Sequence, residues 1–462
     1  MSFLVIAALT LLVYYPSLWH APRSDQIVYF FVTAPWHDWS RLTIPCYDLN
    51  RWGIFAAGDE KLFRPLVFLF LGTEKYFFGY NFWAWQAVGI ILHLAVIGFL
   101  MKMLWRLGSS RVAFVSSLFF ALLLMNMEMV IWSHIHSYLI FVLALLIALD
   151  QIYLFIVEDK QDRWRWALVG TCFLVAGFIY ETANIFAVLS FLFLFKKKHS
   201  WTLLIPFGLY LVLDGINAMG HHITQTIPPL NLLQGLIHTV LACGFWLYSG
   251  LWPAAVQLYF DGRNMIKEES LNDLLSYLAA IAAGVSIAMG LKRLERPHRK
   301  FLFLLLAMVL AYALVIVMGR GQVYSVHQTL IRNTHYYYSF WALTIMATGV
   351  LLSTLKNQML KTVFVTALVG LSLINGVKLY QINDLQAKGS QATIVLARAV
   401  ELLVQEKKDQ KDFSFYVPPD YPGNYAYQDA YGRKSSFIGM LYPQYYTTRH
   451  PKYKFLVHPH GS

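Results

Sequence analysis

The chain has 462 residues, of which 58% are hydrophobic and only 13% are charged, and its formal net charge is +12. Soluble domains average about 25% charged residues, so this composition excludes an ordinary soluble protein and indicates a polytopic membrane protein. The basic excess does not predict nucleic-acid binding, because neither a basic helix nor a stacking platform occurs outside the apolar segments.

Apolar runs long enough to cross a bilayer recur along the chain. They predict an all-α bundle, because the short alternating segments of an outer-membrane barrel are absent. We expect about eleven crossings, at Phe3–Trp19, Trp83–Met101, Val112–Ile131, Tyr138–Val157, Trp166–Tyr180, Ala183–Phe195, Trp201–Leu213, Leu271–Gly290, Phe301–Met318, Tyr336–Leu355 and Thr362–Tyr380. A further apolar segment, Leu230–Trp252, would upset the alternation of the connectors if it crossed alone. We interpret it as re-entrant or lying along the outer surface, and a full span paired with Pro253–Phe260 is the alternative.

Lysine and arginine concentrate in short connectors between these runs, at Lys102–Arg111, Lys160–Arg165, Lys196–Lys198, Lys292–Lys300 and Lys356–Lys361. The alternate connectors around Ser133–Ser137 and Glu181–Asn184 contain neither residue. The positive-inside rule therefore predicts a cytoplasmic N-terminus and an external C-terminus. The chain has no Asn-x-Ser/Thr acceptor, which favours a bacterial inner (cytoplasmic) membrane.

Two parts of the chain are predicted to lie outside the membrane. The first is the loop His20–Phe82, in which Thr43–Phe55 and Pro65–Tyr80 read as surface helices rich in interfacial aromatic residues. The second is a small periplasmic or extracellular C-terminal domain, residues 381–462, that follows a transmembrane domain of residues 1–380.

The composition of this C-terminal part shifts from polar to rich in Tyr, Pro and Gly. Its segment Gln391–Lys407 predicts an amphipathic helix, and Phe413–Val417 predicts a strand. The role of this part cannot be derived from its residues.

The segment Gly319–Leu352 is the most informative for function. It places Arg320, Arg332 and the three tyrosines Tyr336–Tyr338 at the mouth of an apolar helix, without a neighbouring acid. Guanidinium groups and phenol hydroxyls at a membrane surface suit a phosphate headgroup. We therefore predict a site for a phosphorylated lipid, and basic side chains that snorkel at helix ends are the alternative.

Glu181, in GFIYETANI, lies at the predicted outer end of two apolar helices with no basic residue beside it. Acids in membrane segments are costly and often functional. We expect Glu181 to hold an arginine of the site or a metal, and a helix-end residue facing water is the alternative. The histidines do not have the spacing of a zinc site.

Three features in chain order resemble the bacterial GT-C glycosyltransferases, in particular the transmembrane mannosyltransferases with C-terminal TPR repeats. They are Asp25 in RSDQIVYF after the first helix, the stretch Leu62–Leu94 with its Arg-Pro-Leu motif and His-Leu end, and an Arg-x-x-x-Tyr-x-Tyr pattern at Arg332, Tyr336 and Tyr338. The resemblance covers roughly the first two hundred residues and Gly319–Leu352. Gln26 follows Asp25 where the family usually has a second acid, and no TPR repeats follow.

The resemblance implies a GT-C-like bundle that moves a sugar from a polyprenyl-phosphate carrier to an acceptor on the outer face of the membrane, with inversion at the anomeric carbon. It implies Asp25 as general base, with Asp38 or Asp48 as a candidate partner acid. Candidates for binding the donor phosphate, with Glu181 in support, are Arg64, Arg320, Arg332, Tyr336 and Tyr338.

The implied partners are a lipid-linked sugar donor, membrane lipids and an acceptor that is a glycan, a lipid or a protein, with no nucleic acid. No cofactor is certain, and a divalent metal cation held by Asp25 and a second carboxylate stays open. The sugar, the acceptor and the oligomeric state cannot be derived from the residues.

Two other functions remain open. A flippase or carrier of a lipid-linked saccharide would use the same arginines, but it would need polar residues deep in several helices and an internal repeat, and we find little of either. A glycan polymerase or ligase would also carry outward basic residues, but it would not require Asp25.

Overall fold

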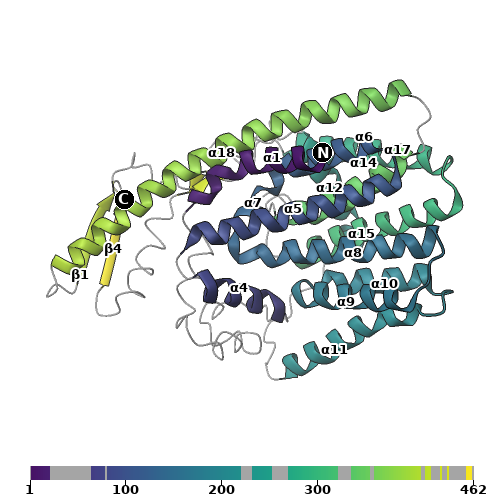
Figure 1. The fold of residues 1–462 in the computed structure, drawn as a ribbon, viewed down its shortest axis with the longest axis horizontal. Helices are drawn as coiled ribbons and strands as arrows, with labels where there is room; N and C mark the ends of the chain where they lie inside the picture. Colours follow the sequence, from purple (N-terminus) through teal and green to yellow (C-terminus); the bar gives the residue numbers. More distant parts are fainter. Residues whose placement is uncertain are drawn as a thin grey trace.

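The computed structural model describes residues 2–20, 64–78, 81–219, 232–251, 269–320, 335–353, 358–406, 412–417, 427–428, 434–435 and 454–459. Nearly all of these residues are helical, and Figure 1 shows the helices side by side in one bundle with a long helix along its edge. The expectation of a helical multi-pass membrane protein agrees with this arrangement.

Within the described residues, the N-terminal half of the bundle contains ten helical elements, several of them short. In chain order they are α1 (Ser2–Tyr14), η1 (Tyr15–Trp19), α4 (Pro65–Phe78), α5 (Phe82–Leu107), α6 (Ser110–Leu122), η4 (Leu124–Asn126), α7 (Met127–Ile131), η5 (Ser133–Ile135), α8 (His136–Val157) and α9 (Arg163–Ile179).

The described residues of the C-terminal half add eight more. They are α10 (Thr182–Leu194), η6 (Ser200–Leu203), α11 (Leu204–Met219), α12 (Leu232–Leu251), α14 (Glu269–Leu291), α15 (Arg296–Arg320), α17 (His335–Ser353) and α18 (Gln358–Glu406). The predicted surface helix Pro65–Tyr80 corresponds to α4, whereas Thr43–Phe55 lies outside the described residues.

By length and composition, six of the described helices can each cross a membrane, at Ser2–Trp19, Phe82–Leu107, His136–Val157, Leu274–Leu291, Arg296–Met318 and Gln358–Lys388. The bent pair formed by α6 and η4–α7 gives a seventh if it counts as one span. The predicted count of eleven is not confirmed. Three expected spans are short, because α9, α10 and α11 have 17, 13 and 16 residues, whereas a span needs about 20.

The predicted span Val112–Ile131 is broken at Leu123, which has extended backbone, and its two parts meet at 55°. Asparagine side chains replace the lost helical hydrogen bonds: Asn126 Nδ2 donates to the Phe120 carbonyl at 2.7 Å, and Asn375 Oδ1 accepts from the Leu124 amide at 3.1 Å. A backbone break inside a membrane bundle requires such replacements, because no water is available there.

Helix α12 contacts its neighbours near the connection between α15 and α17. A Cβ on Gly235 would lie 2.5 Å from the sulfur of Met318, near the end of α15, and one on Gly250 would lie 2.4 Å from the ring of Trp341, six residues into α17. The two glycines are about 22 Å apart along the helix, so α12 packs against both α15 and α17 over much of its length. The interpretation of Leu230–Trp252 as re-entrant or lying along the surface, with the full span as the alternative, stays a prediction.

The two predicted helices Thr362–Tyr380 and Gln391–Lys407 are parts of a single helix, α18, with 49 residues. The predicted domain boundary after residue 380 falls inside it. Buried Asn383 fixes α18 to the first helices, because its Nδ2 donates to the Val13 carbonyl at 3.1 Å and its carbonyl lies 2.8 Å from His20 Nε2.

Short strands follow α18 in the chain, and two of them lie beside the end of that helix that projects beyond the bundle (Figure 1). Strand β1 (Asp412–Val417), where the strand Phe413–Val417 is predicted, pairs in parallel with β4 (Lys454–Pro459). Strands β2 (Tyr427–Gln428) and β3 (Lys434–Ser435) pair antiparallel.

The basic connectors lie at one end of the bundle. Lys197 forms an ion pair with Asp159 of the connector between α8 and α9, and His298 lies 3.4 Å from the hydroxyl of Tyr153 near the end of α8. Gly108, after α5, lies beside the end of α17. We call this the Asp150 end, and the opposite end, where α4 lies (Figure 1), the Arg64 end.

Candidate functional site

Arg64 is the centre of a polar cluster at the Arg64 end. Its Nε and Nη2 donate to the two carboxylate oxygens of Glu181 at 2.8 and 2.7 Å, and its Nη1 donates to the hydroxyl of Tyr138 at 2.7 Å. The first two bonds are the parallel pair of a bidentate arginine–carboxylate contact. A guanidinium has five N–H groups, so two of them have no partner within the described residues.

Aromatic rings surround the guanidinium. Its central carbon lies 4.8 Å from the ring centroid of Tyr180 and 6.0 Å from that of Tyr138, and these two rings lie 5.3 Å apart. A cation over a ring face is attracted by the ring quadrupole. We call Arg64, Tyr138, Tyr180 and Glu181 the arginine cluster. The rings and the carboxylate hold the guanidinium in one orientation.

Local sequence explains how three separate elements meet here. Arg64 immediately precedes Pro65, the first residue of α4, and a residue before proline avoids helical backbone, so Arg64 stays outside the helix. Tyr180 has extended backbone (φ −148°, ψ 120°) and separates α9 from α10, which places Glu181 in a tight turn. Tyr138 lies in the first turn of α8.

A chain of tyrosines connects the arginine cluster to α17. The ring of Tyr312 lies 6.3 Å from that of Tyr180, and its hydroxyl donates to the Tyr336 carbonyl at 3.1 Å. The Tyr336 side chain is buried. Predicted residues far apart in sequence, Arg64, Glu181 and Tyr336, are thus brought into one region.

Tyr338 is not brought to this region. Its hydroxyl lies 2.7 Å from His93 Nδ1, and its ring packs edge-to-face on Phe120 at 4.9 Å, so it faces α5 and α6. Residues two apart on a helix point in directions about 200° apart, so Tyr336 and Tyr338 could share a site only on an extended segment. The segment is helical from His335, and this separates the two predicted phosphate ligands.

The other predicted site residues cannot be placed by their side chains. Asp25, Asp38, Asp48 and Arg332 lie outside the described residues, and only the backbone of Arg320, the last residue of α15, is described. Within the part of the chain that the structure describes, no three His, Cys, Asp or Glu side chains lie together as a metal site would require. The roles of these residues stay predictions.

A buried carboxyl–histidine pair was missed by the sequence analysis. Glu74 Oε1 lies 3.1 Å from His136 Nδ1, and His136 Nε2 lies 3.1 Å from the Val130 carbonyl. A carbonyl only accepts, so Nε2 carries a hydrogen and the Glu74–His136 contact needs one further proton between its partners. Burial raises the pKa of Glu74, and His136 opposes this shift.

This pair fixes α4, and therefore Arg64, against α8. Gly89 makes room for it, because a Cβ there would come within 2.1 Å of the Val130 carbonyl oxygen and 2.5 Å of His136 Nε2. The sequence did contain a signal for this pair, because Glu74 and His136 are ionisable residues within otherwise apolar segments.

A second network at the Asp150 end was also missed. Buried Asp150 of α8 accepts from Lys102 Nζ at 3.0 Å and pairs with Arg106, both on α5. Gln151 Nε2 donates to Asp150 Oδ2 at 3.2 Å, and Gln151 Oε1 accepts from Arg165 Nη1 at 2.7 Å. An aspartate near the end of an apolar run, with two cations one helical turn apart on a neighbouring run, was the sequence signal.

Comparisons with known proteins give no relative: no family model matches the chain, and neither the curated proteins nor the solved structures contain a match.

Proposed function

We propose that this protein is an inverting glycosyltransferase that moves a sugar from a polyprenyl-phosphate carrier to an acceptor at the Arg64 end of the bundle. The observation that supports this most directly is the arginine cluster, which leads through Tyr312 to Tyr336. Arg332 is four residues before Tyr336, so its Cα lies at most about 14 Å away. An oriented arginine near a segment with a second arginine suits a lipid phosphate.

The position of the first outward loop supports Asp25 as the base. His20, held at the Asn383 carbonyl, closes η1 at the same end of the bundle as α4 (Figure 1). Asp25 is five residues further along, at most about 18 Å from His20. In the proposed step, the Asp25 carboxylate takes the proton of the acceptor hydroxyl as its oxygen bonds to the anomeric carbon. The bond from that carbon to the phosphate oxygen breaks, and the carrier leaves as a phosphate monoester anion.

The three arginines are assigned different roles, because only Arg64 is neutralised by a carboxylate within the described residues. Arg64 and Glu181 together carry no net charge, so the pair offers oriented N–H donors rather than excess positive charge. Donors already fixed where charge develops stabilise a transition state without reorganisation. We assign the excess positive charge at the donor phosphate to Arg320 and Arg332, and the alignment of a phosphate oxygen to Arg64.

The proposed orientation puts the arginine cluster outside the cytoplasm. The gathering of the basic connectors at the Asp150 end supports it, because such connectors are retained in the cytoplasm. We place the chain in a bacterial inner membrane with α18 leading outward to the C-terminal strands.

The test is transfer of a radiolabelled sugar by purified protein, with a synthetic polyprenyl-phosphate sugar as donor and membrane extract as acceptor. Asp25→Asn is expected to lower transfer by roughly 10²–10⁴-fold while donor binding is kept, the usual weight of general base catalysis. Asp59→Asn, in the same loop, is the matched control and is expected to transfer normally.

Near wild-type transfer by Asp25→Asn would remove Asp25 from the mechanism. A carrier forms no glycosidic bond, so donor movement across vesicles without any product would instead reject the transferase.

A further inference from the structure

A groove lies between α9 and α11, and no residue of the arginine cluster lines it. Its volume is about 430 Å³, within the range of about 300–1,000 Å³ found for ligand pockets. Helix α11 lies at the edge of the bundle, so the groove is peripheral (Figure 1). It is lined by Arg163, Trp166, Ala167, Gly170, Thr171, Leu174, His199, Thr202, Ile205 and Pro206.

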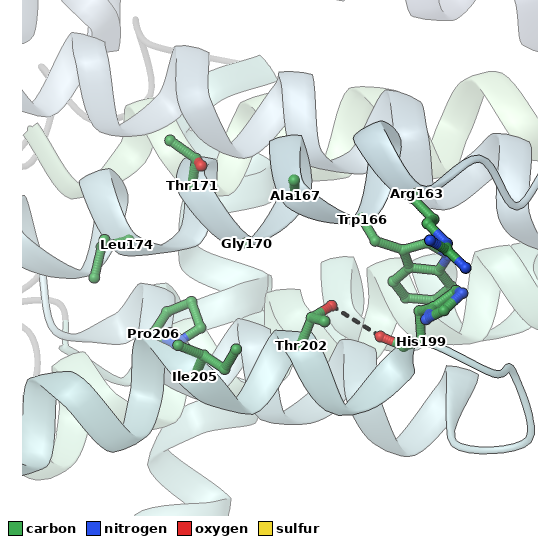
Figure 2. A pocket seen from close by; sticks show the side chains of 10 residues that line it. All are labelled: Arg163, Trp166, Ala167, Gly170, Thr171, Leu174, His199, Thr202, Ile205 and Pro206. Carbon is green, nitrogen blue, oxygen red and sulfur yellow. Dashed lines mark hydrogen bonds between the residues drawn. The ribbon is translucent and has the colours of Figure 1, made fainter.

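The groove is basic at one end and apolar at the other. Figure 2 shows Arg163 and His199 together beside Trp166, whereas Leu174, Ile205 and Pro206 lie at the far end. Trp166 is buried and stacks on Phe155 with a centroid distance of 4.0 Å, so it forms a firm wall. A ligand that fits this surface has an anionic head and an apolar tail.

The acids near the basic end are already paired. Asp162 accepts from Arg165 Nε at 2.6 Å, Glu158 pairs with Lys160 at 2.6 Å, and Asp159 pairs with Lys197. Within the described residues neither Arg163 nor His199 has an ion pair. Arg163 is exposed and His199 is half-buried, so their nitrogens are open to an anion.

The length of the groove matches one leaflet. From Arg163 to Leu174, helix α9 rises about 16 Å. The hydrocarbon core of a bilayer is about 30 Å thick, so one leaflet is about 15 Å deep. The basic end lies among the basic connectors, where anionic lipids concentrate opposite Lys and Arg.

We propose that this groove binds an anionic glycerophospholipid of the bilayer, with its phosphate at Arg163 and His199 and one acyl chain along Gly170 and Pro206. Gly170 has no side chain to fill the space, since the nearest atom to a Cβ there is the Thr202 carbonyl at 3.7 Å. In this position the lipid contacts both α9 and α11 and fills the space between them. The site is separate from the proposed transferase site, so it stands if that function fails.

The test is native mass spectrometry of the full-length protein titrated with dioleoyl phosphatidylglycerol, and in parallel with dioleoyl phosphatidylethanolamine. The wild-type protein is expected to bind the anionic lipid preferentially. Arg163→Gln is expected to weaken that binding about fivefold, the effect of one basic residue at an anionic surface. Gly170→Phe, which fills the apolar end and keeps both head contacts, is expected to weaken binding of both lipids more than tenfold.

Arg111→Gln is the matched control, since Arg111 is an exposed arginine at the same end of the bundle but outside the groove. If it weakens binding as much as Arg163→Gln, the lipid association is diffuse and the site is rejected. Displacement of the lipid by millimolar inorganic phosphate would also reject a lipid site, because the head alone would then account for binding. Should Gly170→Phe not fold, Ala167→Phe on the exposed side of α9 makes the same test, and unchanged binding by it would overturn the proposal.

Discussion

The two ends of the bundle each carry an ion-pair network, and the two networks are built in opposite ways. At the Arg64 end the cation is the inner partner: Arg64 is 14% exposed and Glu181 is 30% exposed. At the Asp150 end the carboxylate is the inner partner, 2% exposed, and its cation Lys102 is 52% exposed. The first arrangement fixes a guanidinium between protein oxygens and rings. The second fixes α5 to α8 and leaves its cations at the surface, where the positive-inside rule places them.

The difference in which partner is buried indicates that the Arg64 network is suited to binding a ligand and the Asp150 network to holding helices together. A guanidinium with two N–H groups that no described residue accepts can orient a ligand. A buried aspartate between two cations has no comparable capacity, and it stabilises helix packing. Variants at the two ends should therefore separate activity from stability.

Among variants of the two networks, Arg64→Lys is expected to have the largest effect. Lysine keeps the charge but cannot form the bidentate contact with Glu181 or the bond to Tyr138 at the same time. Loss of an oriented donor should lower transfer about 10²-fold, measured with the labelled donor in the same assay. Arg111→Lys, at the other end, is the control. Equal transfer rates in the two variants would show that the arginine cluster has no part in the reaction.

Asp150→Asn should change stability and leave transfer per folded molecule unchanged. Removing one partner of a buried pair costs about 3–5 kcal/mol, but these cations reach the solvent, so about 1–3 kcal/mol is expected. The measurement is the free energy of unfolding in mixed micelles with increasing dodecyl sulfate. Asp159→Asn, in the neighbouring exposed connector, is the comparison. A large loss of activity in folded Asp150→Asn protein would contradict the division between the two ends.

A third experiment concerns pH at the Arg64 end. Helix α4 is not among the helices long and apolar enough to cross a membrane, and burial raises the pKa of Glu74 above its ordinary value of 4.5. A raised folded-state pKa means that the protonated carboxyl favours folding, so this stability is full below about pH 4.5 and is lost as the pH rises through the raised value. Glu74→Gln keeps a neutral partner for His136 and should remove this decline. Unfolding at several pH values, with exposed Glu295→Gln as control, measures it. Parallel pH profiles of wild type and Glu74→Gln would show that Glu74 does not titrate in this way.

The smallest effect is expected from Tyr338→Phe. The change removes one hydrogen bond to His93, which should lower the free energy of unfolding by about 0.5–1.5 kcal/mol. Because Tyr338 faces α5 and α6, donor binding should be unchanged, as measured by titration with the polyprenyl-phosphate sugar. A clear loss of donor affinity would restore Tyr338 to the phosphate site.

Much of the helical framework could be predicted from apolar runs and basic connectors. The run Tyr138–Val157 corresponds to α8 within two residues, and the segment after Arg64 does form a helix of its own. The connectors were informative because charge at a helix end costs little near water and much inside the bilayer.

The bend at Leu123 and the continuity of α18 could not be predicted. Leu123 lies in an apolar run like any other, and the break depends on Asn375, more than two hundred residues away. The shift to polar residues after Tyr380 suggested the end of a helix, but Asn383 bonds to Val13 of α1 and to His20 after η1 from inside a continuous helix.

The candidate site was predictable only in part. Glu181 was expected to hold an arginine or a metal, and it pairs with Arg64. Which arginine, and which tyrosines accompany it, depends on how α4, α8 and α9 converge, and no local pattern contains that information.

The unbroken course of α18 has a mechanical consequence. A helix of 49 residues is about 73 Å long, and a crossing uses about 30 Å of this length. The remainder is an arm that transmits rotation, because each residue turns the helix by about 100°. One residue inserted after Lys388 would turn the C-terminal strands to another side of the bundle, whereas seven would restore nearly the original direction at a greater height. The length of α18 therefore fixes both the distance of the C-terminal strands from the membrane and the side of the bundle on which they lie.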